Sequence, residues 1–185
     1  MRTSETNAAQ GAGRPCIVMR RGPEPLPLLN LPVGVCLFPF GEDGPAVWEH
    51  IVNTAFGSAF VFDTKMRAEP AFRPERIIFL AQNDKPVAVA AAWQRDKWPP
   101  GTGYLHYVGV LPEAQGQALG YWVSLAALHQ MRREGNACAV LETHDFRLAA
   151  IKTYLRLGFV PDTTTHESYA QRWAEIMAKL DEGRP

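Results

Sequence analysis

The sequence has no excess of charge of either sign. Its 185 residues contain 19 lysines and arginines against 19 aspartates and glutamates, so its formal net charge at pH 7 is zero. A strong field of one sign is what draws a protein to nucleic acid or to an anionic membrane, and this chain lacks one. We therefore expect no nucleic-acid partner and instead a small-molecule partner.

Long apolar runs are also missing. Nowhere does an apolar stretch approach the roughly 18 residues of a membrane-spanning helix. Residues 1–14 are small and polar, without the apolar centre of a secretion signal. The chain is therefore expected to be cytoplasmic, with no membrane partner and with a disordered tail over residues 1–14.

Cysteines are few, and metal-binding patterns are absent. Cys16, Cys36 and Cys138 are far apart and form no Cys-x-x-Cys pair, which predicts reduced thiols in the core. No His, Cys, Asp or Glu cluster has metal-ligand spacing, so no metal site is expected. The Gly-x-Ser-x-Gly turn of serine hydrolases is missing as well.

The patterns that are present alternate between strand and helix. Residues 15–30 hold a short strand at Cys16–Met19 and then a proline-rich linker, and a single domain is predicted over residues 31–185. Gln82–Lys85 is a turn of hairpin length, which predicts an antiparallel pair. We predict an α/β (α+β) fold with a mixed sheet, with strands at 33–38, 76–81, 86–93, 103–110, 137–141 and 159–161, and helices at 45–57, 119–134 and 148–157 and around Trp173–Leu180.

The loop Gln115–Gly120 joins a predicted strand to a predicted helix and has small residues at positions 116, 118 and 120. The first turn of a helix leaves about four N–H groups unpaired and carries about half a positive charge. Such a loop binds a diphosphate without lysine or arginine. Taken alone, the same pattern also describes an ordinary tight connection.

Two motifs resemble a known family. The run Val108–Gly120 (VGVLPEAQGQALG) resembles the acetyl-CoA motif of the GNAT superfamily of N-acetyltransferases, a Q/R-x-x-G-x-G/A loop entered from a strand that ends in V-x-P. Ala150–Phe159 (AIKTYLRLGF) is similar to the downstream A-I-x-x-Y-x-x-x-G-F segment of that superfamily. The resemblance covers residues 31–161 in element order. It implies a mostly antiparallel central sheet with splayed parallel strands, flanked by helices.

The resemblance also implies the cofactor, acetyl-CoA, and the residues that hold it. The backbone of Val108, Gly109 and Val110 would pair with the pantetheine arm. Ala118 stands where the family usually has glycine. Arg147 stands where many members of the family carry an asparagine near the CoA arm, and there it would either contact the phosphate or ribose of CoA or merely cap surface charge. The pyrophosphate would be held by Gln115, Gly116, Gln117, Ala118, Leu119 and Gly120.

The same resemblance places Tyr154 where a tyrosine commonly protonates the departing thiolate, although a core aromatic would fit the same helical position. The attacking amine needs a base, and His106 is the candidate because it is the group with an ordinary pKa near 6.5 in Gly103–Val110. Glu142 and His144 are alternative members of a water relay.

The predicted function is acetyl transfer from acetyl-CoA to a primary amine of a small molecule, by direct attack. A non-catalytic acyl-CoA sensor is the alternative. A Rossmann-type enzyme is disfavoured because no Gly-x-Gly-x-x-Gly follows the first strand. Three alternative roles are open for the helix around Trp173. It could cover the acceptor pocket, pack on the core, or pair two subunits as a homodimer.

Overall fold

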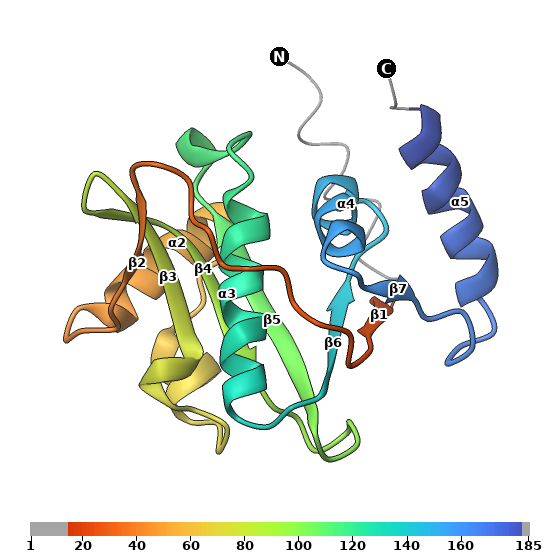
Figure 1. Ribbon diagram of the computed structural model, residues 1–185, viewed down its shortest axis with the longest axis horizontal. Helices are drawn as coiled ribbons and strands as arrows, with labels where there is room; N and C mark the ends of the chain where they lie inside the picture. The colour runs from red at the N-terminus through yellow and green to blue at the C-terminus, as the bar shows by residue number, and fades with distance from the viewer. Residues whose placement is uncertain (1–14, 183–185) are drawn as a thin grey trace. The chain divides into compact units, whose positions relative to one another are not determined.

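The computed structural model describes residues 15–182 (Figure 1). These residues form two compact units, one of residues 22–139 and one of residues 15–21 together with 140–182. The N-terminal strand therefore belongs to the same unit as the C-terminal segments. The single domain over 31–185 stays a prediction, and the predicted tail of residues 1–14 lies outside the described residues.

The unit of residues 22–139 contains four antiparallel strands in chain order: β2 (Val35–Phe38), β3 (Ile77–Gln82), β4 (Lys85–Trp93) and β5 (Thr102–Val110). The predicted hairpin is confirmed, since Gln82 and Lys85 pair across a two-residue turn. Asn83 and Asp84 in that turn have φ of 49° and 61°. Positive φ at both central positions is what a type I′ hairpin turn requires.

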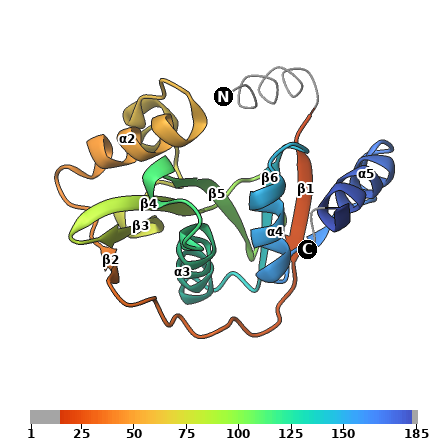
Figure 2. The same cartoon turned by 90° about the horizontal axis from the view of Figure 1, so that it is seen from above.

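Strand β4 is buried on both of its faces. Two helices at the predicted positions, α2 (Gly44–Phe56) and α3 (Leu119–Arg133), lie on opposite sides of the sheet (Figure 2). Every residue of β4 from Val87 to Trp93 is buried, and four of these seven are alanines. Small side chains let a helix approach closely on either side. The inward face of α2 carries Trp48, Ile51 and Val52, which are fully buried.

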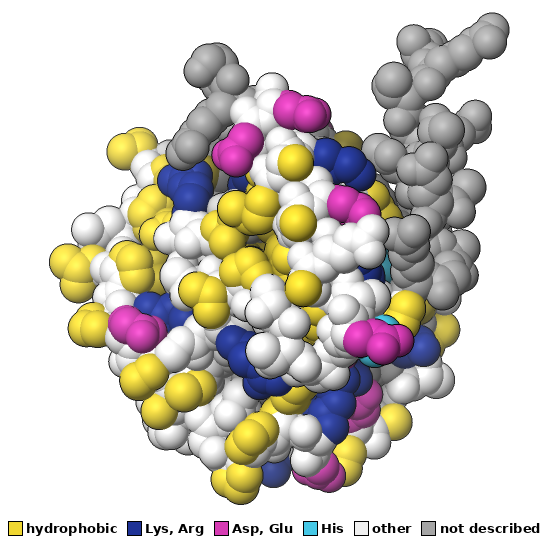
Figure 3. Space-filling view, turned by 90° about the vertical axis from the view of Figure 1, so that its right-hand side faces the viewer, with side chains coloured by type: hydrophobic (Ala, Val, Ile, Leu, Met, Phe, Trp, Pro, Cys, Tyr) yellow, Lys and Arg dark blue, Asp and Glu magenta, His cyan; other side chains and the backbone are white. Residues whose placement is uncertain are grey.

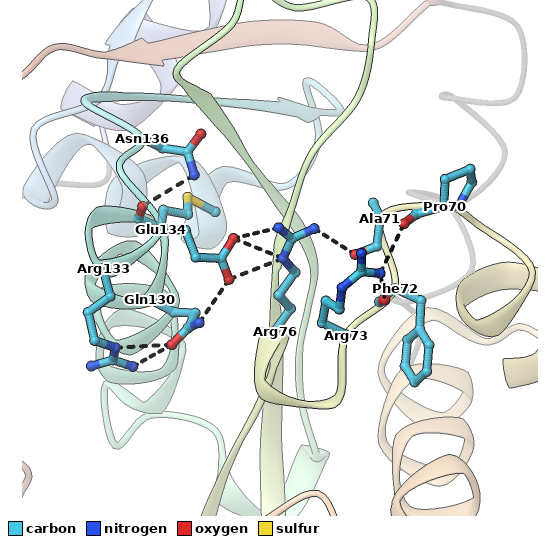
Figure 4. A network of polar contacts seen from close by, with 10 residues as sticks. Pro70, Ala71, Phe72, Arg73, Arg76, Gln130, Arg133, Glu134 and Asn136 are labelled. Atoms are coloured by element: carbon cyan, nitrogen blue, oxygen red, sulfur yellow. Dashed lines mark hydrogen bonds and ion pairs between the residues drawn. The ribbon is translucent and has the colours of Figure 1, made fainter.

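A polar network ties the loop before β3 to the C-terminal end of α3 (Figure 4). Arg76 donates from Nε and Nη2 to the carboxylate of Glu134, at 2.9 and 2.7 Å, and from Nη1 to the carbonyl of Ala71 at 2.7 Å. Gln130 donates to the same carboxylate at 2.8 Å. Short helical turns, η1 (Asp63–Arg67) and η2 (Pro74–Arg76), lie in this segment.

The other unit is built around β1 (Ile17–Arg21). This strand lies between β6 (Cys138–Thr143) and β7 (Val160–Pro161), and it runs antiparallel to β7. Two helices belong to this unit, α4 (Leu148–Arg156) and α5 (Tyr169–Glu182), both at predicted positions. Trp173 of α5 is buried and donates from Nε1 to the carbonyl of Asp162 at 3.0 Å. The last helix therefore packs within its own unit.

The burial of the cysteines differs from the prediction. The three cysteines are free, but Cys36 is exposed and the other two are half-buried, so the prediction of core thiols is wrong. Cys36 lies on β2, the edge strand of its sheet.

On the face drawn in Figure 3, basic and acidic side chains are interspersed. Within residues 15–182, no helix is long and apolar enough to cross a bilayer, and no cluster of three or more His, Cys, Asp or Glu could hold a metal.

A single carboxylate, Asp162, organises the chain between β7 and α5. Its oxygens accept hydrogen bonds from the backbone N–H groups of Thr164 and Thr165 at 2.9 and 3.0 Å, and from Nε of Arg20 at 2.7 Å. Burial alone would raise the pKa of Asp162, but these bonds and those from the threonine hydroxyls outweigh it and hold the pKa well below the usual value. The ionised form therefore stabilises the fold.

We expect Asp162→Asn to lower the free energy of unfolding at pH 7 by about 2 kcal/mol, because a charge-assisted acceptor is lost from a buried site. The carboxyl binds its proton less readily in the folded chain than in the unfolded chain. Its stabilisation is therefore present above pH 3.8, the ordinary pKa of the group, and is lost as the pH falls below it. Urea titrations from pH 7 to 3 should show the difference between wild type and variant shrinking.

The control is Asp63→Asn, which removes an exposed carboxylate paired with Arg67. An exposed pair contributes little, so this variant should unfold within about 0.5 kcal/mol of wild type. Equal effects of the two substitutions would contradict the role given to Asp162.

Candidate active site

Strand β5 carries a bulge where the candidate residues begin. Val89 pairs with Gly109 and Ala91 pairs with His106, so two residues of β5, Tyr107 and Val108, lie opposite one residue of β4. Tyr107 has φ of 46°, an uncommon value for a residue with a side chain. Bulges often occur next to active sites, where they redirect the strand. The bulge separates His106 from the predicted cofactor segment Val108–Val110.

Beyond β5 the chain turns into α3 through an exposed loop. A short helical turn at Pro112–Ala114 leads into Gln115–Ala118, where Gly116 and Ala118 have φ of 80° and 57°. No side chain caps α3. Among the described residues, no acceptor is found for the backbone N–H groups of Gly116, Leu119 or Gly120. Unpaired N–H groups at a helix N-terminus are suited to bind an anion, so a pyrophosphate on this loop stays a prediction.

The side chains of the loop leave this backbone accessible. The Gln117 side chain accepts a hydrogen bond from Gln82 at 2.6 Å, which ties it to β3. Gln115 donates to the Val110 carbonyl over a long 3.4 Å, a contact that a ligand pairing with the strand would displace. A Cβ added at Gly116 would meet nothing within 4 Å. The loop is therefore free of protein packing on its outer side.

Tyr154 and Arg147 both belong to α4, in the unit of residues 15–21 and 140–182. Tyr154 is 7% exposed, and burial raises its pKa to about 12, with Arg147 acting in the opposite direction. Arg147 stands at the first position before the helix, with its guanidinium 5.9 Å from the ring of Phe146. The other predicted site residues, from His106 to Gly120, lie in the unit of residues 22–139.

His106 contacts an arginine that the sequence analysis did not single out. Nη2 of Arg95 lies 3.2 Å from Nε2 of His106, and because a guanidinium only donates, Nε2 must be the acceptor. Burial and the nearby Arg95 charge lower the pKa of His106 to about 3. The imidazole is therefore neutral at pH 7, as a base must be, but it is a weak proton acceptor.

Aromatic rings surround the bulge on the α2 side. The ring of Tyr107 lies 5.0 Å from Trp48 and 5.8 Å from Phe60, both edge to face, and 3.9 Å from His106. Burial raises the pKa of Tyr107, while Arg95 lowers it and Glu69 raises it. The Trp48 side chain is fully buried, and its Nε1 has no hydrogen-bond partner among the described residues. In the sequence, Trp48 lies within the helix predicted at residues 45–57, and no local pattern there indicates a place beside the bulge.

The alternative relay residues lie in the other unit. His144 stacks on Phe146, and its Nε2 lies 3.7 Å from the sulfur of Cys16. Burial, followed by the positive charge of Arg147, lowers the pKa of His144. Glu142 is half-buried on β6 and raises the pKa of Tyr169. His144 and Glu142 thus contact groups of their own unit, and a water relay through them stays a prediction.

Comparison with known proteins agrees with this geometry. Residues 46–159, more than half of the chain, match the family model described as the acetyltransferase (GNAT) family. The chain is 36% identical over 160 residues to a mycothiol acetyltransferase of Streptomyces griseus, covering 80% of this chain and 50% of that protein. A mycothiol acetyltransferase of Thermomonospora curvata is 33% identical over 165 residues, covering 82% and 54%. The chain thus spans about half the length of these curated relatives.

Solved structures share the fold. A GCN5-related N-acetyltransferase from Sphaerobacter thermophilus matches with a TM-score of 0.65 and 21% identity, covering 80% of this chain and 50% of that one. One from Kribbella flavida matches with a TM-score of 0.60 and 23% identity, covering 80% and 55%. The predicted fold class is confirmed.

We expect Gly120→Ala to act in opposite directions on stability and on binding. A Cβ at this position would meet Val110 at a comfortable 3.8 Å, and alanine is the better helix former, so unfolding free energy should rise by about 0.5–1 kcal/mol. The same methyl group would obstruct a pyrophosphate on the backbone, so acetyl-CoA should bind at least tenfold more weakly. Thermal unfolding and calorimetric titration measure the two effects.

The matched control is Gly41→Ala, since an added Cβ there meets nothing within 4 Å. It should leave acetyl-CoA affinity unchanged. Unaltered affinity in Gly120→Ala would show that the ligand does not approach the first turn of α3.

Proposed function

The chain belongs to the GNAT family of acetyltransferases, and on that premise we propose that it transfers an acetyl group from acetyl-CoA to a primary amine of a small molecule. The observation that carries the proposal is the uncapped N-terminus of α3 directly after the bulged strand β5. The curated relatives named as acetyltransferases favour transfer over the alternative of a non-catalytic sensor.

The loop fits the cofactor on its own chemistry. A pyrophosphate needs several N–H donors and room for close approach, and the uncapped amides around Gly116 and Gly120 offer both. Ala118 meets the local backbone requirement at some cost, because φ of 57° strains a residue with a Cβ. When bound, acetyl-CoA supplies a thioester, whose acyl carbon an amine can attack. In this proposal Val108, Gly109 and Val110 align its arm through their backbone groups.

Tyr154 is proposed as the proton donor to the leaving sulfur. With a pKa of about 12 the phenol is fully protonated at neutral pH and ready to donate. Complete transfer to a thiolate of ordinary pKa of about 8.5 would be uphill. The expected contribution is therefore mainly a hydrogen bond that strengthens as charge develops on sulfur. Arg147, which lies close enough to affect the pKa of Tyr154, is proposed to contact CoA.

The amine must lose a proton before it attacks the thioester. His106 remains the predicted base, and it has the neutral form that a base requires. Its pKa of about 3 makes it a weak one, and its Nε2 is already engaged by Arg95. A base of this kind would give a pH–rate profile without an inflection near pH 6.5, since the group does not titrate there.

Calorimetric titration with acetyl-CoA, and with NAD as a comparison, tests the proposal first. Saturable binding of acetyl-CoA alone is expected. An amine panel that includes deacetylated mycothiol, chosen because of the name of the curated relatives, then measures the acetylated product by mass spectrometry. Absence of acetyl-CoA binding would end the proposal, and binding without turnover of any amine would favour the sensor.

We expect Tyr154→Phe to lower kcat about 100-fold while acetyl-CoA affinity stays within about twofold of wild type, because only the hydroxyl is removed. Stopped-time assays of thiol release and calorimetry measure the two quantities. The control is Tyr169→Phe, which removes a hydroxyl that donates to the Cys16 carbonyl. A normal kcat in Tyr154→Phe would exclude it as the acid.

A further inference from the structure

Arg95 is a cation without an anionic partner among residues 15–182. It follows β4 in the unit of residues 22–139, and within the described residues no carboxylate oxygen lies within 4 Å of its nitrogens. Its Nε is buried and has no hydrogen-bond acceptor. Glu69 is close enough to raise the pKa of Tyr107, but its carboxylate accepts a hydrogen bond from Nε1 of Trp93 at 2.8 Å. Leaving a buried charged donor unpaired is costly.

Two fixed groups nevertheless hold the guanidinium in place. It lies over the ring of Tyr104 at 4.8 Å from the centroid, and Tyr104 is itself only 4% exposed. On its edge, Nη2 donates to Nε2 of His106. Both contacts come from β5, and neither neutralises the charge. The guanidinium is thus fixed in position, while its Nε–H has no acceptor among the described residues.

We propose that Arg95 is a specificity-determining residue that binds an oxyanion, a carboxylate or a phosphate, carried by the amine acceptor. The inference rests on the proposed acetyl transfer and narrows its substrate class to anionic amines. An arginine fork with free donors in a partly desolvated site is suited to bidentate binding of such groups. His106 serves here as a positioning residue for Arg95.

The position of Arg95 beside His106 of β5 fits an acceptor site. His106 precedes the proposed cofactor segment by two residues, on the order of 7 Å along a strand. The bulge at Tyr107 lies between them, and the aromatic rings of Trp48 and Phe60 border it. An acceptor bound by its oxyanion at Arg95 would therefore have its amine end near the bulge.

The test compares amines as matched pairs, glycine with glycinamide, β-alanine with β-alaninamide, and glucosamine 6-phosphate with glucosamine. Wild type should prefer the anionic member of at least one pair, and Arg95→Gln should reduce that preference at least tenfold, about 1.4 kcal/mol. Comparing variants on the same pair cancels differences in amine basicity. The carboxylate and phosphate pairs distinguish the two sources of oxyanion.

Lys97→Gln is the matched control, because it removes the same charge from the same loop. It should keep the wild-type preference, and acetyl-CoA affinity should be equal in all three proteins. If Lys97→Gln also lost the preference for anionic amines, the preference would reflect the overall positive charge of the loop and not binding at Arg95. A fall in acetyl-CoA affinity in Arg95→Gln would assign the side chain to the cofactor. Either result would overturn the proposal.

Calorimetry of the same pairs without acetyl-CoA separates this inference from the proposed function. If no amine is acetylated, tighter binding of the anionic members that disappears in Arg95→Gln still supports the oxyanion site, while the transfer proposal fails. Turnover with no preference for anionic members would overturn the oxyanion site alone. No preference in either binding or turnover would overturn it as well.

The positioning role of His106 is tested by measuring the preference for anionic amines in two His106 variants. His106→Leu removes the acceptor for Nη2 and should lower the anionic preference, whereas His106→Gln retains an acceptor oxygen and should restore much of it. Equal preferences in both variants would exclude the positioning role.

Discussion

Burial of β4 on both faces is the constraint on which the arrangement of the unit of residues 22–139 depends. A strand lined by alanines allows α2 and α3 to approach closely from opposite sides. Packing rather than capping holds α3, since Val123, Ala126 and Ala127 are buried while the first turn has no side-chain cap. The helix can therefore leave its N-terminal N–H groups open to a ligand at little cost to the fold.

Strand β5 connects the two chemical parts of that unit. Its last residues lead to the open helix terminus, and residues before its bulge hold Arg95 through Tyr104 and His106. The two proposed anion sites would attract their ligands by different means. Backbone dipoles suit a diphosphate whose position is set by the fold, and a guanidinium fork suits a smaller oxyanion that must be selected. A chain with zero net charge can bind anions in both ways because the positive potential is local.

Much of the fold could be predicted from the sequence because its signals are local. The helix predicted at residues 45–57 is present as α2, and the turn at Gln82–Lys85 predicted the β3–β4 hairpin. The loop before α3 was recognised by its small residues. The exposure of Cys36 was predicted wrongly, because an apolar neighbourhood in sequence does not tell an edge strand from a central one.

The sequence by itself determined the order of the elements and the family, because periodicity, turn chemistry and motif spacing act over a few neighbouring residues. Only the tertiary structure decided that His106 is neutral at pH 7 and that Arg95 has no carboxylate partner among the described residues. Arg95 and His106 come from different segments, and burial together with proximity sets their ionisation. Desolvation and distance arise only when segments meet in space, so no local pattern could supply them.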